Sequence, residues 1–125
     1  MKTHFILYVS DQNKSGEFYS AVLVEKPTLD VPGMTEFKLG PETVLGLMPE
    51  ASASRLLGSE IVPQYSSGVP RAELYLIVED PAAYHARALA AGALEISPLS
   101  KRDWGHEAAY SLDISGHVLA FAREI

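Results

Sequence analysis

Two residues able to carry chemistry, His4 and Glu73, each stand at the start of a short apolar stretch of the chain. Histidine can serve as a base, a hydrogen-bond donor or a metal ligand near neutral pH. A carboxylate on an apolar strand needs a partner or water, because burial of an unpaired charge is unfavourable. Together the two side chains could form a hydrogen-bonded pair, a proton-transfer dyad or half of a metal site. The simpler alternatives are a hydrogen-bonded or solvated His4, and a Glu73 that pairs with Arg71 at an exposed strand start.

A second set of residues is suited to holding an organic ligand. Tyrosine and tryptophan offer a flat apolar surface with a polar tip, methionine fills irregular pockets, and arginine can meet an anion. The candidates for ligand contact are Tyr8, Tyr75, Trp104, Met48 and Arg102. Packing in the core is the alternative for the tyrosines, the tryptophan and the methionine, and exposure to solvent is the alternative for the arginine.

Both sets of residues fall on two copies of one pattern of secondary structure. Residues 4–9 and 72–78 are predicted to be strands, and each strand is followed by an Asp able to cap a helix. We expect His85 to face outward on the second helix, without a functional role. Three strands are predicted after each helix, at 28–31, 35–39 and 43–48 in the first copy, and around 96, at 108–112 and at 118–122 in the second.

A supersecondary unit used twice predicts an α+β fold with paired βαβββ modules. Their curled mixed sheets are expected to surround a cleft, with the helices on the outer faces. Strand alternation places His4 and Tyr8 on one face of the first strand, and Glu73 and Tyr75 on one face of the equivalent strand. His4 and Glu73 should then occupy matching positions in the two copies.

The 125 residues suit a single domain, 1–125, with one shared core. Repeat one covers about residues 1–50, a linker about 51–70, and repeat two about 71–125. The linker is rich in Ser, Gly and Pro, and it is long enough to form a lid or a packed excursion.

Composition excludes several classes of function. A formal net charge of −6 and the lack of a Lys and Arg cluster argue against nucleic-acid binding. Without cysteine, the chain can form no disulfide, thiolate metal site or thiol nucleophile. No stretch approaches the roughly 18 apolar residues of a membrane helix, and no leader pattern precedes the first strand. We expect a cytoplasmic protein that contacts neither nucleic acid nor membrane.

The chain resembles the vicinal oxygen chelate superfamily, which includes glyoxalase I, extradiol dioxygenases, and fosfomycin- and bleomycin-resistance proteins. The resemblance covers nearly the whole chain. Its sharpest pieces are residues 4–11, the Phe18-Tyr19 pair ahead of Leu23, and residues 110–120, an aromatic strand followed by a Gly-His turn and a terminal strand. These pieces indicate the superfamily but no single activity. The resemblance implies a glyoxalase/bleomycin-resistance-like domain that forms a homodimer.

In metal-using members of the superfamily, each repeat supplies one ligand from its first strand and one from its last. The resemblance assigns the first-strand positions to His4 and Glu73. The last-strand positions fall on Gly46 and Ala120, whose side chains cannot bind metal. A catalytic metal keeps about three protein ligands, so we expect no metal and no other cofactor. If a divalent metal is present, His4 and Glu73 hold it. Residues that could complete such a site are His106, Glu107 and His117.

The favoured function is a small-molecule-binding protein with a metal-free cleft, in which Tyr8, Tyr75 and Trp104 contact an aromatic or amphipathic ligand. Sequestration of an antibiotic or a toxic metabolite is one form of this function, and the negative net charge favours cationic ligands. The alternative is a metal-dependent lyase of the glyoxalase type, an isomerase or a dioxygenase, with His4 and Glu73 as the catalytic candidates. A third possibility is an interaction module whose cleft is filled.

Overall fold

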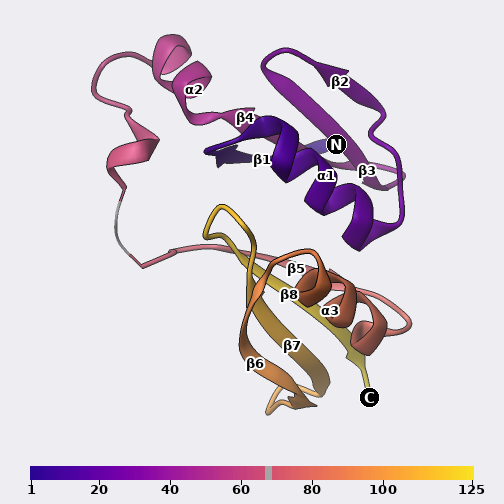
Figure 1. Ribbon diagram of the computed structural model, residues 1–125. Helices are drawn as coiled ribbons and strands as arrows, with labels where there is room; N and C mark the ends of the chain where they lie inside the picture. Colours follow the sequence, from indigo (N-terminus) through magenta and orange to yellow (C-terminus); the bar gives the residue numbers. More distant parts are fainter. Residues whose placement is uncertain (67–68) are drawn as a thin grey trace. The chain divides into compact units, whose positions relative to one another are not determined.

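The computed structural model describes residues 1–66 and 69–125, so residues 67 and 68 of the predicted linker lie outside the described part. The chain divides into two compact units, Met1–Ser20 with Val24–Val69, and Ala21–Leu23 with Pro70–Ile125. Each unit holds one four-stranded mixed sheet (Figure 1). The predicted α+β class, with two βαβββ modules, is confirmed.

The first module has its strands in the order β1-β4-β3-β2, with β1 and β4 parallel and the other pairs antiparallel. The predicted linker forms a helix and a short 3-10 turn where it is described. The elements are β1 (Thr3–Val9), α1 (Gln12–Leu23), β2 (Leu29–Val31), β3 (Met34–Gly40), β4 (Thr43–Pro49), α2 (Glu50–Leu57) and η1 (Pro63–Tyr65).

Helix α1 begins and ends by local backbone chemistry. The Asp11 carboxylate accepts a hydrogen bond from the Lys14 amide at 3.0 Å, as predicted for an N-cap. The helix ends at Leu23, because Val24 adopts a left-handed conformation with φ 56°. Pro27 disfavours helical geometry in the residue before it, so the sequence predicts a helix that continues to Lys26; the helix is shorter than this prediction.

The core of the first sheet lies on the face that α1 covers. Leu7, Phe37 and Leu45 are buried on this face, and the Phe37 ring lies 6.4 Å from that of Tyr19 on the helix. His4 and Tyr8 lie on the opposite face, so the predicted alternation of this strand is confirmed.

The turn between β2 and β3 is fastened to α1 by one side chain. The Gln12 amide nitrogen donates to the Val31 carbonyl at 2.8 Å and to the Thr35 hydroxyl at 2.9 Å. Its carbonyl oxygen accepts from the Gly33 amide at 3.0 Å. Since Thr35 is buried, this network satisfies polar groups that water cannot reach easily.

The second module repeats this plan with the strand order β5-β8-β7-β6, again with one parallel pair, β5 and β8. Helix α3 packs on one face of the sheet, where the Tyr84 and Phe121 rings lie 5.2 Å apart. The Asp80 carboxylate caps this helix through the Ala83 amide at 3.1 Å. The elements are β5 (Glu73–Ile77), α3 (Pro81–Ala90), β6 (Leu94–Lys101), β7 (His106–Leu112) and β8 (Val118–Glu124).

One expectation for α3 is wrong. His85 is not turned outward; it is 7% exposed, and its Nε2 atom lies 2.9 Å from the Glu95 carboxylate. His85 lies between Pro81 and Ala88 on the inward stripe of the helix. The helix is rich in alanine, so no run of large apolar residues marks that stripe in the sequence.

The two modules share one strand register. His4 lies beside Val44 in the first parallel pair, and Glu73 lies beside Val118 in the second. The same register matches Gly46 with Ala120. His4 and Glu73 therefore hold equivalent positions in the two modules, as the repeat predicts.

In the part of the chain that the structure describes, no helix is long and apolar enough to cross a membrane.

Candidate ligand-binding site

An aromatic cluster lies on the face of the second sheet opposite α3. Tyr75 on β5 and Tyr110 on β7 both lie beside Ala120 of the intervening strand β8. The small alanine side chain allows the two rings to approach across it, and their centroids lie 6.5 Å apart at 55°.

The Tyr75 hydroxyl joins two further side chains to this cluster. It accepts a hydrogen bond from Trp104 Nε1 at 3.1 Å, and it lies 2.8 Å from His106 Nδ1. Trp104 is 55% exposed, so the indole is held by its nitrogen while much of its ring faces solvent. A held, half-exposed indole is suited to stacking on an organic ligand.

The turn that carries Trp104 is held from several directions. The Arg102 amide donates to the His106 carbonyl at 2.8 Å, which closes the turn between β6 and β7. Gly105 has φ 83°, a conformation that other residues rarely adopt. The Ile125 amide donates to the Gly105 carbonyl at 3.0 Å, so the last residue of the chain also fixes the turn.

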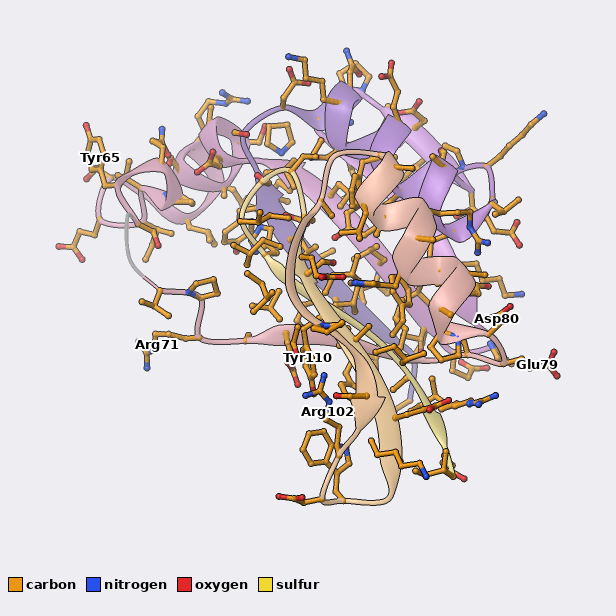
Figure 2. All side chains as sticks on the ribbon, turned by 60° about the horizontal axis from the view of Figure 1, so that its bottom comes forward. Tyr65, Arg71, Glu79, Asp80, Arg102 and Tyr110 are labelled. Atoms are coloured by element: carbon orange, nitrogen blue, oxygen red, sulfur yellow. The ribbon has the colours of Figure 1, made fainter. Side chains whose placement is uncertain are left out.

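The Arg102 guanidinium supports the cluster from within the protein. Its Nη2 atom donates to the Ala108 and Pro98 carbonyls at 2.7 and 3.0 Å and to the Ser97 hydroxyl at 2.9 Å. Its charged carbon lies 5.1 Å from the centre of the Tyr110 ring, and the two side chains lie together in Figure 2. Nε also donates to the Ala108 carbonyl, at 3.2 Å, so the Nε and Nη2 donors are already engaged, and a role in ligand binding stays a prediction.

The surroundings of Tyr110 raise the pKa of its hydroxyl. Burial raises the pKa of its hydroxyl above the usual value of 10.0, and the Glu73 carboxylate raises this pKa further. Tyr75 acts in the same direction, and the Arg102 guanidinium acts against it. Tyr110 therefore offers a neutral O–H donor at neutral pH. This hydroxyl has no hydrogen-bond partner among the described residues.

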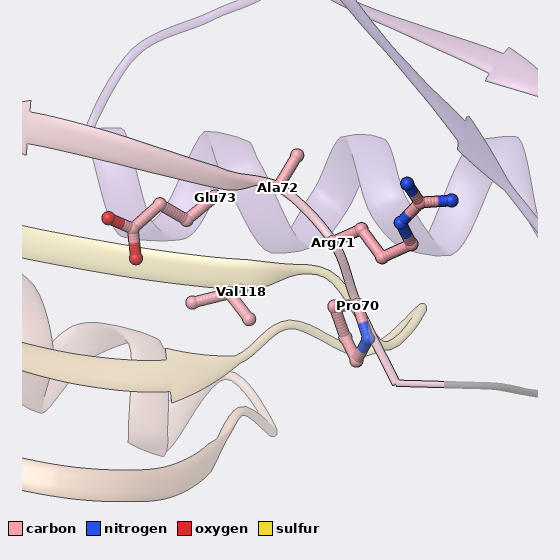
Figure 3. A pocket seen from close by; sticks show the side chains of 5 residues that line it. All are labelled: Pro70, Arg71, Ala72, Glu73 and Val118. Carbon is pink, nitrogen blue, oxygen red and sulfur yellow. The ribbon is translucent and has the colours of Figure 1, made fainter.

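A pocket of about 310 Å³ opens at the start of β5 (Figure 3). Glu73 lies on its wall, two residues before Tyr75 and on the same face of the strand. The side chains of Glu73 and Arg71 extend in opposite directions, so the close-up does not show the simple pairing considered from the sequence. The pocket is lined by Pro70, Arg71, Ala72, Glu73 and Val118.

The candidate residues of the first module lie on the face of its sheet opposite α1. His4 Nδ1 lies 3.5 Å from the Glu36 carboxylate, so this histidine has a partner within its own module. Tyr8 and Met48 are neighbours across the β1–β4 pair. A side chain at Gly46 would collide with Ile6 Cδ1, so the position is filled by an apolar neighbour.

The residues present do not fit a catalytic metal of the superfamily type. The last-strand positions, Gly46 and Ala120, bring no donor atom. Of the possible replacements, Glu107 pairs with Arg123, and His106 uses Nδ1 toward Tyr75. Within residues 1–66 and 69–125, no three His, Cys, Asp or Glu side chains are grouped so as to hold an ion.

The structure unites only some of the predicted site residues. Tyr75, Trp104 and Arg102 come together in the second module, and Glu73 lies beside them. His4, Tyr8 and Met48 belong to the first module. Tyr110 was not predicted as a site residue, and His106 was considered only as a metal ligand. The period-two alternation of residues 106–110 would have placed both on one face, had the strand been predicted to begin two residues earlier.

Comparisons with solved structures identify the fold. The chain is similar to a glyoxalase-related enzyme from Fulvimarina pelagi, with a TM-score of 0.86, 20% identity, and coverage of 99% of this chain and 88% of the other. It is also similar to a glyoxalase/bleomycin resistance protein/dioxygenase family enzyme from Burkholderia phytofirmans PsJN, with a TM-score of 0.81, 18% identity, and coverage of 98% and 97%.

A glyoxalase/bleomycin resistance protein from Albidiferax ferrireducens T118 has a TM-score of 0.73 at 19% identity, with coverage of 98% of each chain. No protein-family model and no curated protein matches the sequence. The chain therefore has the glyoxalase/bleomycin resistance/dioxygenase fold, as the sequence resemblance predicts. At these identities the likeness extends to the fold alone.

Proposed function

We propose that the protein binds a small aromatic or amphipathic organic molecule, without a catalytic metal, on the face of the second sheet that carries Tyr75, Trp104 and Tyr110. Sequestration of an antibiotic or a toxic metabolite is the form of this function that we favour. The observation that supports it most is the state of Trp104, which is half exposed yet anchored by a hydrogen bond to Tyr75.

The charge of the site favours a cationic ligand. Glu73 lies on the pocket wall beside this cluster, and it is close enough to Tyr110 to raise the pKa of the phenol. The Nε and Nη2 donors of Arg102 are engaged by protein acceptors, so this guanidinium offers an anionic ligand fewer donors than a solvated arginine would. The net charge of −6 adds a weak, longer-range preference of the same sign.

Three indole compounds that differ in charge test this proposal: tryptamine, indole and indole-3-acetate. Calorimetric titration should give the tightest binding for the cation and the weakest for the anion. Trp104→Ala should weaken tryptamine binding about five- to thirtyfold, which corresponds to about 1–2 kcal/mol of lost stacking. Tyr65→Ala is the matched control, because Tyr65 is 82% exposed on η1, which belongs to the other compact unit of the chain. Equal weakening by both variants would contradict the proposed site.

A metal titration tests the competing enzyme function. Untagged protein is assayed for bound metal and then titrated with Ni²⁺, Zn²⁺, Mn²⁺ and Fe²⁺. We expect no stoichiometric binding, because the described donors do not form a three-ligand site. Stoichiometric binding that is lost in His4→Ala would favour the metal-dependent lyase, isomerase or dioxygenase instead.

A further inference from the structure

We propose that the protonation state of His106 sets the ligand charge that the site prefers: neutral His106 favours a cationic ligand, and protonated His106 favours an anionic one. This inference rests on the proposed function, because Tyr75 and His106 belong to the same aromatic cluster. It adds regulation by pH to a site otherwise described only as a binding surface. The switch is the hydrogen bond between these two side chains, which reverses its direction when the imidazole gains a proton.

The two partners of the Tyr75 hydroxyl differ in the hydrogen bonds that they can form. An indole N–H can only donate, so Trp104 Nε1 gives its proton to the Tyr75 oxygen at 3.1 Å in every state of the site. His106 Nδ1, at 2.8 Å, accepts when it is unprotonated and donates when it carries a proton. The direction of this second hydrogen bond therefore depends on the protonation of His106.

Neutral His106 accepts a hydrogen bond from Tyr75. A phenol O–H is a stronger donor than a neutral imidazole N–H, and the bare imidazole nitrogen is a stronger acceptor than the phenol oxygen. The hydrogen bond that Tyr75 accepts from Trp104 also polarises the O–H group and strengthens it as a donor. The Tyr75 proton is then used by Nδ1, while one lone pair of the phenol oxygen stays available. The ammonium group of a cationic ligand can donate to this lone pair.

Protonated His106 donates a hydrogen bond to Tyr75. Both ring nitrogens of an imidazolium carry protons, so the Tyr75 oxygen accepts from Trp104 and from His106 Nδ1 at once. Its two lone pairs are then used, and its own proton turns away from both partners, where it can donate to a carboxylate. The imidazolium also places a positive charge beside the Tyr75 ring, since the two ring centroids lie 5.9 Å apart. A cationic ligand therefore loses an acceptor and meets repulsion, whereas an anionic ligand gains a donor and attraction.

Other charged and titratable groups surround His106 on the neighbouring strands and in the β6–β7 turn. They are Glu73 and Tyr75 on β5, Tyr110 on β7, Glu124 opposite His106 on β8, and Arg102 and Asp103 in the turn. Carboxylate and guanidinium groups normally keep their charge between about pH 5.5 and about pH 8. The raised pKa of Tyr110 keeps its phenol neutral over the same range. Since histidine normally titrates within this range, His106 is the group of the cluster whose charge changes.

Calorimetric titration with tryptamine and with indole-3-acetate, each at about pH 5.5 and about pH 8, tests the switch, because both compounds keep their charge in this range. From the higher to the lower pH, the affinity for tryptamine should fall about three- to tenfold, and the affinity for indole-3-acetate should rise by a similar factor. His106→Asn keeps a polar group near the position of Nδ1 but does not titrate, so both affinities should change less than about twofold.

His85→Gln is the matched control. It removes a titratable histidine from helix α3, on the other face of the same sheet, and the glutamine amide can still donate to Glu95. This variant should keep the full pH response of the wild-type protein. Nuclear magnetic resonance of nitrogen-labelled protein then reports the imidazole itself: His106 Nδ1 should be unprotonated at about pH 8 and protonated at about pH 5.5. A proton on Nδ1 at both pH values would overturn the switch.

The remaining outcomes separate this inference from the proposed function. Binding with the same charge preference at both pH values would overturn the switch and leave the proposed function standing, and no binding of either compound would overturn both. A pH response that persists in His106→Asn would belong to another group and would also overturn the switch. If circular dichroism shows that His106→Asn does not fold, Tyr75→Phe decides, because it keeps the imidazolium charge but has no hydroxyl. A folded Tyr75→Phe with the full wild-type response would refute the reversal of the hydrogen bond.

Discussion

Removal of the Tyr75 hydroxyl tests the structure of the cluster independently of any ligand. In Tyr75→Phe the ring stays in place, while the hydrogen bonds to Trp104 and His106 are both lost. Each such bond contributes about 0.5–1.5 kcal/mol net. Because Trp104 is half exposed and can bond to water instead, we expect a total loss of about 1–2 kcal/mol in the free energy of unfolding.

Two assays report this change. A loss of this size should lower Tm by about 3–10 °C for a chain of this length. Trp104 is the one tryptophan of the sequence, so its fluorescence reports the turn directly. We expect a red-shifted emission and faster quenching by acrylamide, since the indole gains contact with water.

Tyr84→Phe is the matched control for both assays. The Tyr84 hydroxyl has no hydrogen-bond partner among the residues that the structure describes, so its loss should change neither Tm nor fluorescence. If Tyr75→Phe behaves like this control, the Tyr75 hydroxyl does not anchor Trp104, and the reasoning behind the binding site fails.

Three further predictions follow from the described contacts. The pKa of Tyr110 is raised, so its share of the stability is present below about pH 10 and is lost as the pH rises through the higher folded-state pKa. In a spectrophotometric tyrosine titration, Tyr110→Phe should remove a late-titrating group, and Glu73→Gln should move it to lower pH; identical curves would contradict the burial and charge effects. Gln12→Ala should lower the free energy of unfolding in urea by about 1–3 kcal/mol through three lost hydrogen bonds. Asn13→Ala, at an exposed neighbour, should change it by less than about 0.5 kcal/mol. Arg102→Lys keeps the positive charge but loses the planar guanidinium that bonds to Ser97 and Pro98, so the turn should open more often and amide hydrogen exchange in residues 102–105 should accelerate. Unchanged exchange would show that charge alone holds the turn.

The strands of this fold could be predicted because their side chains alternate. From Ile6 to Val9 of β1, half-buried and buried residues alternate, and the repeat relates the register of the two sheets. Helix starts were also predictable, since Asp11 and Asp80 are local capping signals. The end of α1 was not, because Val24 adopts a left-handed conformation that its residue type does not favour.

The contacts of the cluster could be predicted only in part. Trp104 and Tyr75 are 29 residues apart, and no local pattern relates an indole N–H to a distant phenol. Arg102 supports the cluster by donating to main-chain carbonyls. Every residue has a main-chain carbonyl, so the residue types around Arg102 do not predict these hydrogen bonds. The prediction that His85 faces outward was wrong, because a helix rich in alanine lacks the large apolar side chains whose spacing would identify its buried face.

The shared register of the two modules gives each position of one sheet a counterpart in the other. Tyr75 corresponds to Ile6, and Tyr110 corresponds to Glu36, the residue that pairs with His4. The same scaffold thus carries an aromatic surface in one module and a carboxylate–imidazole pair in the other. The first module can serve as an internal template: tyrosines introduced at Ile6 and Glu36 would show whether backbone placement alone suffices to rebuild the aromatic pair.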